Sequence, residues 1–132
     1  MNIIISVLLL GTAVGLIFYW YDFFTKGSVP VINEDWYIKF QKSFPIADIW
    51  TAVCAVIGAV GLITDNGFGP YFTLITGSSL LFVGLMDVTF NVQNKLYQYI
   101  KKSGQMKFEV FVNVWTIGFG ISCISLMWSE IV

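Results

Sequence analysis

Six polar side chains lie within or beside apolar stretches of the sequence, and their functional groups could bind a ligand or transfer a proton. Four are acids and two are amides: Asp22, Asp48, Asp87, Asn91, Glu109 and Asn113. A carboxylate attracts cations and protons, and an ionisable residue inside a membrane is a functional-site hypothesis by default. The set therefore favours a site that binds or moves a small cation, a proton or an amphipathic amine.

Of the six residues, Asp87 is the one whose position within an apolar run most needs a physical explanation. It lies eight residues before Lys95, so about 12 Å of helix separates it from that charge. An acid at such a depth costs about 2.5 to 3.5 kcal/mol on insertion scales. Two explanations stay open. Asp87 is either a functional carboxylate in a polar cavity or a group that holds helices together, by a hydrogen bond or by an ion pair with Lys42 or Lys107.

The other polar residues have simpler structural explanations. Asp48 and Glu109 come near the start of a helical run, where unpaired N–H groups stabilise negative charge. Asp22 comes late in the first apolar run and can reach water. Asn91 and Asn113 match the acids in depth. Because these acids and amides come from four apolar runs and lie at the same predicted depth in the membrane, we expect them to line a pocket that faces the cytoplasm.

The composition shows which elements must position these groups. Of the 132 residues 57% are hydrophobic and only 11% are charged, against about a quarter charged in soluble domains. A soluble fold of this size still exposes roughly a third of its unfolded surface and cannot hide so much apolar area. We therefore predict one all-α transmembrane domain over residues 1–132, an integral membrane four-helix bundle in contact with the lipid bilayer.

Four apolar runs are long enough to cross a bilayer, which takes about 20 residues. The predicted spans are about 3–24, 44–64, 70–93 and 108–129, with the third helix continuing to about 102. The first run lacks the basic segment and the small-residue cleavage site of a signal peptide, so we expect it to be retained.

A polar stripe follows from the predicted continuation of the third helix. Residues that recur at helical spacing there run from membrane depth to the cytoplasm: Asp87, Asn91, Asn94, Gln98 and Lys102. A hydrated vestibule would have such a stripe. For Gln98 and Lys102 a helix end that emerges into water is explanation enough.

Residues 25–43 are too many for a minimal turn between the first two spans. Asn33 is placed to cap a short helix with Glu34 and Asp35 at its start and Lys39 at its end, which suits the helix dipole. We expect this helix to lie on the inner membrane surface as an aromatic anchor.

The lysines predict the orientation in the membrane. All seven lie between spans one and two or between spans three and four: Lys26, Lys39, Lys42, Lys95, Lys101, Lys102 and Lys107. Short lysine-rich loops stay on the cytoplasmic side. We therefore predict that both termini face outward, as in a multi-pass protein of the plasma (inner) membrane of a prokaryote.

Several function classes are disfavoured. The net charge of −1 provides no basic face for nucleic acid. Histidine is absent, and Cys54 and Cys123 are isolated from each other in the sequence, so zinc, haem and thiol redox sites lack their ligands. We expect no cofactor and no metal, and treat both cysteines as small buried hydrophobes. A lipid-modifying enzyme that uses paired carboxylates is the least favoured reading.

Small residues predict where helices come close together. Gly11 and Gly15 form a GxxxG pair in the first span, and Ala55 and Ala59 form a similar pair in the second. Such pairs let helices approach closely within one chain or between two chains. Because a protein this small can complete a site by pairing with a second copy, we expect a homodimer.

The stretches FPIADIW at 44–50 and MDVTFNVQNKLY at 86–97 resemble small four-span prokaryotic membrane proteins with FPxADxW and MDxxFNxQ motifs. The resemblance covers less than half of the chain. It implies a four-helix architecture and a plasma-membrane location, and it carries no activity to these residues. The rival to a binding protein is therefore a structural, accessory or immunity-type membrane protein in which the polar residues only hold helices together.

Overall fold

The computed structural model describes residues 2–27 and 30–132. Its elements are helices α1 (Asn2–Thr25), α2 (Asp35–Gln41), α3 (Pro45–Ile63), α4 (Phe68–Gln93) and α5 (Gly104–Ile131), with a 3-10 turn η1 (Leu96–Tyr99) between α4 and α5. No strand occurs in these two ranges. The all-α prediction is confirmed.

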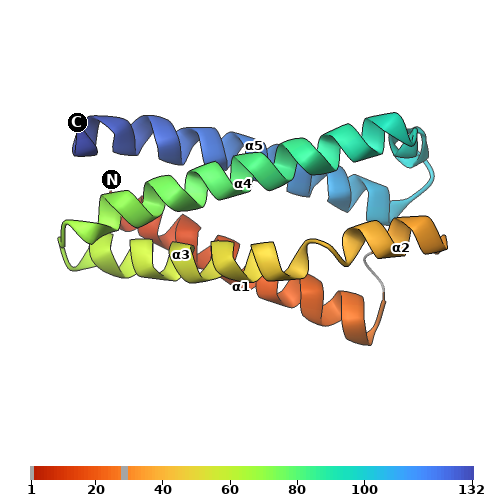
Figure 1. The fold of residues 1–132 in the computed structure, drawn as a ribbon, viewed down its shortest axis with the longest axis horizontal. Helices are drawn as coiled ribbons and strands as arrows, with labels where there is room; N and C mark the ends of the chain where they lie inside the picture. The colour runs from red at the N-terminus through yellow and green to blue at the C-terminus, as the bar shows by residue number, and fades with distance from the viewer. Residues whose placement is uncertain (1, 28–29) are drawn as a thin grey trace.

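The long helices α1, α3, α4 and α5 run along the length of the molecule (Figure 1). Four candidate spans are long and apolar enough to cross a membrane: Asn2–Thr25, Asp35–Ile63, Phe68–Gln93 and Gly104–Ile131. The chain is therefore a multi-pass membrane protein of the four-helix type. The third span begins at Phe68, before Pro70, and the fourth begins at Gly104, four residues before the predicted start.

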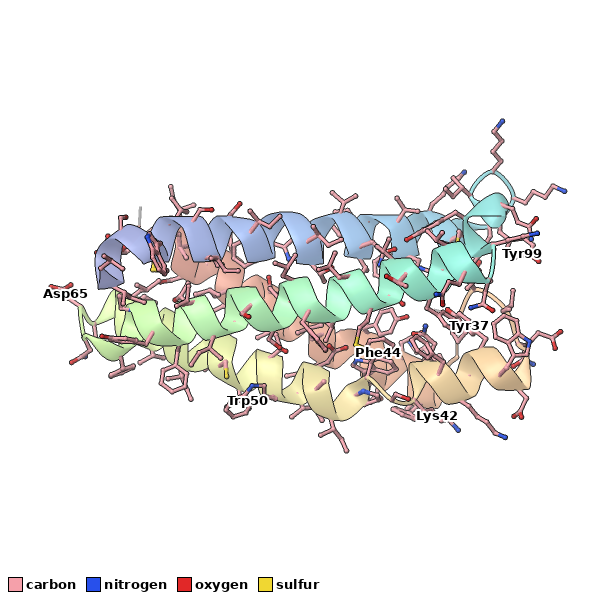
Figure 2. The ribbon with its side chains drawn as sticks, turned by 45° about the horizontal axis from the view of Figure 1, so that its top comes forward. Tyr37, Lys42, Phe44, Trp50, Asp65 and Tyr99 are labelled. Carbon is pink, nitrogen blue, oxygen red and sulfur yellow. The ribbon has the colours of Figure 1, made fainter. Side chains whose placement is uncertain are left out.

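Both termini lie at the same end of the bundle as the α3–α4 turn, and α2 and η1 lie at the other end (Figure 1). Figure 2 shows Asp65 at the first end and Lys42 and Tyr99 at the opposite end. The segments that carry the seven lysines all lie at this second end, which is called the lysine end below.

The predicted continuation of the third helix to residue 102 is wrong. Helix α4 ends at Gln93, and Lys95 adopts a left-handed conformation with φ of 56°. The chain turns there because Leu96 folds back into a buried cluster with Tyr37 and Met106. The stripe that would have joined Asp87 to Lys102 on one helix therefore does not exist.

Helix α2 begins after Glu34, one residue later than the predicted cap at Asn33, and no side chain caps its start. Figure 1 shows it at the end of the bundle where α4 ends, roughly continuing the line of α3. The ring of Phe40 stacks on that of Phe90, with centroids 3.8 Å apart. The predicted surface anchor is thus joined to the bundle through aromatic contacts with α4.

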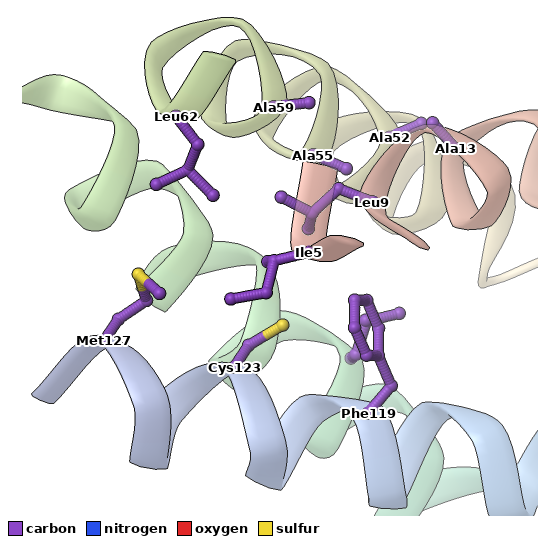
Figure 3. Packing of buried hydrophobic residues seen from close by; sticks show 11 residues of the cluster. Ile5, Leu9, Ala13, Ala52, Ala55, Ala59, Leu62, Phe119, Cys123 and Met127 are labelled. Carbon is purple, nitrogen blue, oxygen red and sulfur yellow. The ribbon is translucent and has the colours of Figure 1, made fainter. Parts of the chain in front are cut away.

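The centre of the bundle is filled by small and aliphatic side chains (Figure 3). The main cluster includes Leu9 from α1, Ala55 and Ala59 from α3, and Phe119 and Cys123 from α5. Both cysteines are buried and free, as predicted for small hydrophobes. The acids and amides predicted as site residues lie outside this core, nearer the lysine end.

Candidate functional site

A cavity of about 510 Å³ lies among the four long helices, with Gln41 of α2 at its border. This size is within the usual range for small-molecule sites, about 300 to 1,000 Å³. The lining residues with polar side-chain atoms are Thr12, Tyr19, Trp20, Gln41, Asp48, Asp87, Glu109, Asn113, Trp115 and Thr116. Most of these residues lie nearer the lysine end, and the rest of the wall is largely apolar.

Asp87 is held at the cavity wall by α5. Its side chain is 9% exposed, and its Oδ2 accepts a hydrogen bond of 2.7 Å from the Nδ2 of Asn113. Its second oxygen, Oδ1, is buried and has no hydrogen-bond partner among residues 2–27 and 30–132. Half of this carboxyl group therefore holds two helices together, and the other half is left to accept a donor.

Asn113 connects Asp87 to Tyr97 of η1, the turn that follows α4. The Tyr97 hydroxyl donates to Asn113 Oδ1 over 2.6 Å, and the Asn91 amide lies 3.4 Å from both Tyr97 Oη and Asn113 Oδ1. Tyr97 reaches this point because the chain reverses at Lys95. The network fixes the orientation of Asn113 and hence of the Asp87 carboxyl.

Glu109 places a second acid at the same location. Its side chain is only 3% exposed, and its carboxyl lies beside the carboxyl of Asp87, the amide of Asn91 and the hydroxyl of Tyr19. Two adjacent carboxylates repel each other when both are ionised, and that repulsion is stronger where water is excluded. A cation or a proton between Asp87 and Glu109 would relieve it.

Asp48 forms a third acidic corner. It lies in the first turn of α3, just after Pro45, where the free N–H groups stabilise an acid. Its Oδ2 accepts a hydrogen bond of 2.6 Å from the indole N–H of Trp20 on α1. Both residues line the cavity, so α1 and α3 are joined at the depth of the other acids.

The ion-pair explanation for Asp87 fails within the described parts of the chain. The salt bridge found there joins Lys39 to Asp35 on the exposed face of α2, over 3.0 Å. Neither Lys42 nor Lys107 pairs with a buried acid in this part of the structure. Gln41 is the polar residue of α2 that lines the cavity, and its Nε2 is buried without a partner among the same described residues.

The structure brings most of the predicted site residues together. Four of the six line the cavity: Asp48, Asp87, Glu109 and Asn113. Asn91 is buried behind them in the amide network. Asp22 is half-buried near the end of α1 and is not part of the cavity lining.

Sequence reasoning missed Gln41, Trp20 and Tyr97 as members of this site. Gln41 belonged to a segment interpreted as a membrane-surface anchor, Trp20 to the first predicted span, and Tyr97 to a helix that does not extend so far. Gln41 shares a face of α2 with Tyr37, but the burial of that face is visible only in the structure.

The cavity opens along the side of the bundle between α1 and α5. Close backbone packing joins α1 to α3, α3 to α4 and α4 to α5. Side chains bridge α1 and α5: the indole of Trp115 donates to Thr12 Oγ1 over 2.9 Å, and Tyr19 stacks on Phe108.

Residues 2–27 and 30–132 contain no group of three or more His, Cys, Asp or Glu arranged to hold a metal ion. The chain matches no family model, no curated protein and no solved structure in the three comparisons made. Fold and site together define a class: a small multi-pass membrane bundle with a cavity lined by three acids.

Proposed function

We propose that this protein binds a small organic cation or an amphipathic amine in the cavity between its helices, and that it moves this ligand or a proton across the membrane. The observation that carries the proposal is the Oδ1 of Asp87, which has no hydrogen-bond partner among the described residues and is buried beside Glu109 in a cavity with largely apolar walls. An acid and an apolar wall are complementary to a cation that carries hydrocarbon.

The setting we propose is the plasma membrane of a prokaryote, with the lysine end in the cytoplasm. The lysine-bearing segments lie at one end of the bundle, and lysine-rich loops are retained inside. In that orientation the acidic part of the cavity is nearer the cytoplasm, and both termini face outward.

A binding assay with one substitution tests the proposal. The full chain is placed in lipid nanodiscs, and binding of tetraphenylphosphonium is measured by equilibrium dialysis, with neutral triphenylphosphine oxide as the comparison ligand. Asp87→Asn keeps the shape of the side chain and its contact with Asn113. It should weaken tetraphenylphosphonium binding by about tenfold to a hundredfold, because it removes the attraction between the carboxylate and the cation, about 1 to 4 kcal/mol for unit charges about 4 Å apart.

Asp65→Asn is the matched control, because Asp65 is exposed in the turn at the far end of the bundle. Its left-handed backbone, with φ of 56°, also suits Asn. The control should bind as the wild type does. Equal cation binding by wild type and a folded Asp87→Asn variant would sink the proposal.

The 2.7 Å bond from Asn113 to Asp87 favours a second candidate, a structural or accessory protein whose polar residues hold α4 and α5 together. That role predicts no saturable cation binding by the wild type. It also predicts that Asp87→Leu lowers stability while Asp87→Asn does not. The dialysis assay and an unfolding measurement together separate the two candidates.

A further inference from the structure

We propose that the ligand is a single-chain amphiphile whose protonated amine lies next to a hydrogen-bond acceptor, and that it reaches the cavity from the bilayer between α1 and α5. This inference rests on the proposed function and names the ligand class for the same site.

The head group is specified by two unpartnered polar atoms of opposite kinds. Asp87 Oδ1 can only accept from a donor when the acid is ionised, and Gln41 Nε2 can only donate. Both side chains line the cavity, at least nine-tenths buried, and neither atom has a partner in the described part of the chain. A simple cation satisfies only the carboxylate. An ammonium beside a hydroxyl or carbonyl oxygen, as in an amino alcohol, satisfies both atoms.

The tail is specified by the apolar part of the cavity. Gly11 and Gly15 of α1 line it, and a Cβ on either would meet no described atom within 4 Å. Exposed Val7 and Phe111 continue the lining. The result is a lipid-facing groove (Val7, Gly11, Gly15 and Phe111) that leads toward the acids. Polar groups at one end and apolar groups along the rest match a molecule with one head and one tail.

A second copy of the chain is a poorer occupant of this groove. The GxxxG pair allows a helix to approach, but α1 and α5 present mainly apolar side chains on their exposed faces. An apolar helix would leave Asp87 Oδ1 and Gln41 Nε2 without hydrogen-bond partners, and an unsatisfied buried polar group is costly. Charge complementarity therefore favours an amine.

Photolabelling tests where the tail lies. The probe is 1-aminododecan-2-ol with a diazirine at the end of its chain, and the protein is the full chain in nanodiscs. After irradiation, mass spectrometry should locate the label on α1 and α5 in the groove, and excess unlabelled amino alcohol should prevent labelling. Labelling spread evenly over the lipid-facing surface, without competition, would overturn the inference.

Two glycine variants test the groove itself. Gly15→Leu should lower affinity for 1-aminododecan-2-ol by at least about tenfold. Gly118→Leu is the matched control, because Gly118 is also exposed with open space around its Cβ position in the described structure but does not line the cavity. If Gly15→Leu leaves affinity unchanged, or if it instead breaks a dimer seen by photobleaching, the groove is not a tail site.

The head group is tested by Gln41→Leu with two ligands. Affinity for 1-aminododecan-2-ol should fall, whereas affinity for dodecylamine, which lacks the hydroxyl, should not change. An equal effect on both ligands overturns the assigned role of Gln41. If tetraphenylphosphonium still binds in an Asp87-dependent way when these tests fail, the proposed function stands and only the ligand class is wrong.

Discussion

The α3–α4 and α1–α5 interfaces both contain small residues and yet differ in how closely they pack. A Cβ on Gly61 of α3 would lie 2.4 Å from the Cα of Gly69 on α4, so these backbones touch. A Cβ on Gly11 or Gly15 of α1 would meet nothing within 4 Å among the described residues. Small residues permit close packing without requiring it, and here the open interface is the one that borders the acids.

The largest expected effect comes from adding a methyl group to the closed interface. Gly61→Ala should lower the free energy of unfolding by about 3 kcal/mol, because the new Cβ meets backbone that cannot move aside. Gly11→Ala should be neutral or stabilise by up to about 1 kcal/mol, since Ala is the better helix former. Equilibrium unfolding in mixed micelles measures both. Equal losses would contradict the difference between the two interfaces.

A smaller effect is expected where the polar network closes α4 onto α5. Asn113→Leu removes the donor to Asp87 and the acceptor for Tyr97, which should cost about 1 to 2 kcal/mol. Asn94→Leu is the control, because Asn94 is exposed and its side-chain amide donates to the backbone carbonyl of Phe90 in its own helix. The same unfolding assay applies. Indistinguishable stabilities for these two variants would show that the network contributes nothing.

A weaker effect is expected at the open α1–α5 interface, where the Trp115 indole donates a hydrogen bond to Thr12. Thr12→Val removes the acceptor for the Trp115 indole and should cost about 0.5 to 1 kcal/mol. Thr89→Val is the matched control. The hydroxyls of Thr12 and Thr89 each donate to the carbonyl four residues earlier in their helix, but Thr12 is the one that also accepts from the Trp115 indole. If Thr12→Val costs no more than Thr89→Val, Trp115 does not tie α5 to α1.

The smallest effect is a dependence on alkaline pH at Tyr97. Burial raises the pKa of its hydroxyl, as do the charges of Asp87 and Glu109, while the Asn91 amide opposes the rise. The Tyr97 hydroxyl therefore loses its proton near pH 10 in the unfolded chain and at a higher pH in the folded chain. Its contribution to the free energy of unfolding is present below pH 10 and declines as the pH rises through the pKa of the folded state. Tyr97→Phe should make the decline shallower. An unchanged pH profile for this variant would rule out the contribution.

Much of the site could be read from the sequence as a list of residues. Asp48, Asp87, Glu109 and Asn113 were predicted to lie at one depth, and they line one cavity. Gln41 and Tyr97 could not be assigned to it, because their positions depend on how α2 packs against α4 and on the reversal at Lys95. Whether the cavity residues bind a ligand stays a prediction.

The sequence by itself determined that four helices cross a membrane, because the length of an apolar run is a local property that the bilayer thickness selects. The end of α4 and the openness of the α1–α5 groove were decided only by the tertiary structure. Both depend on how each helix is rotated against its neighbours and on where Leu96 finds a buried site. Such pairings join residues far apart in the chain, and no local pattern records them.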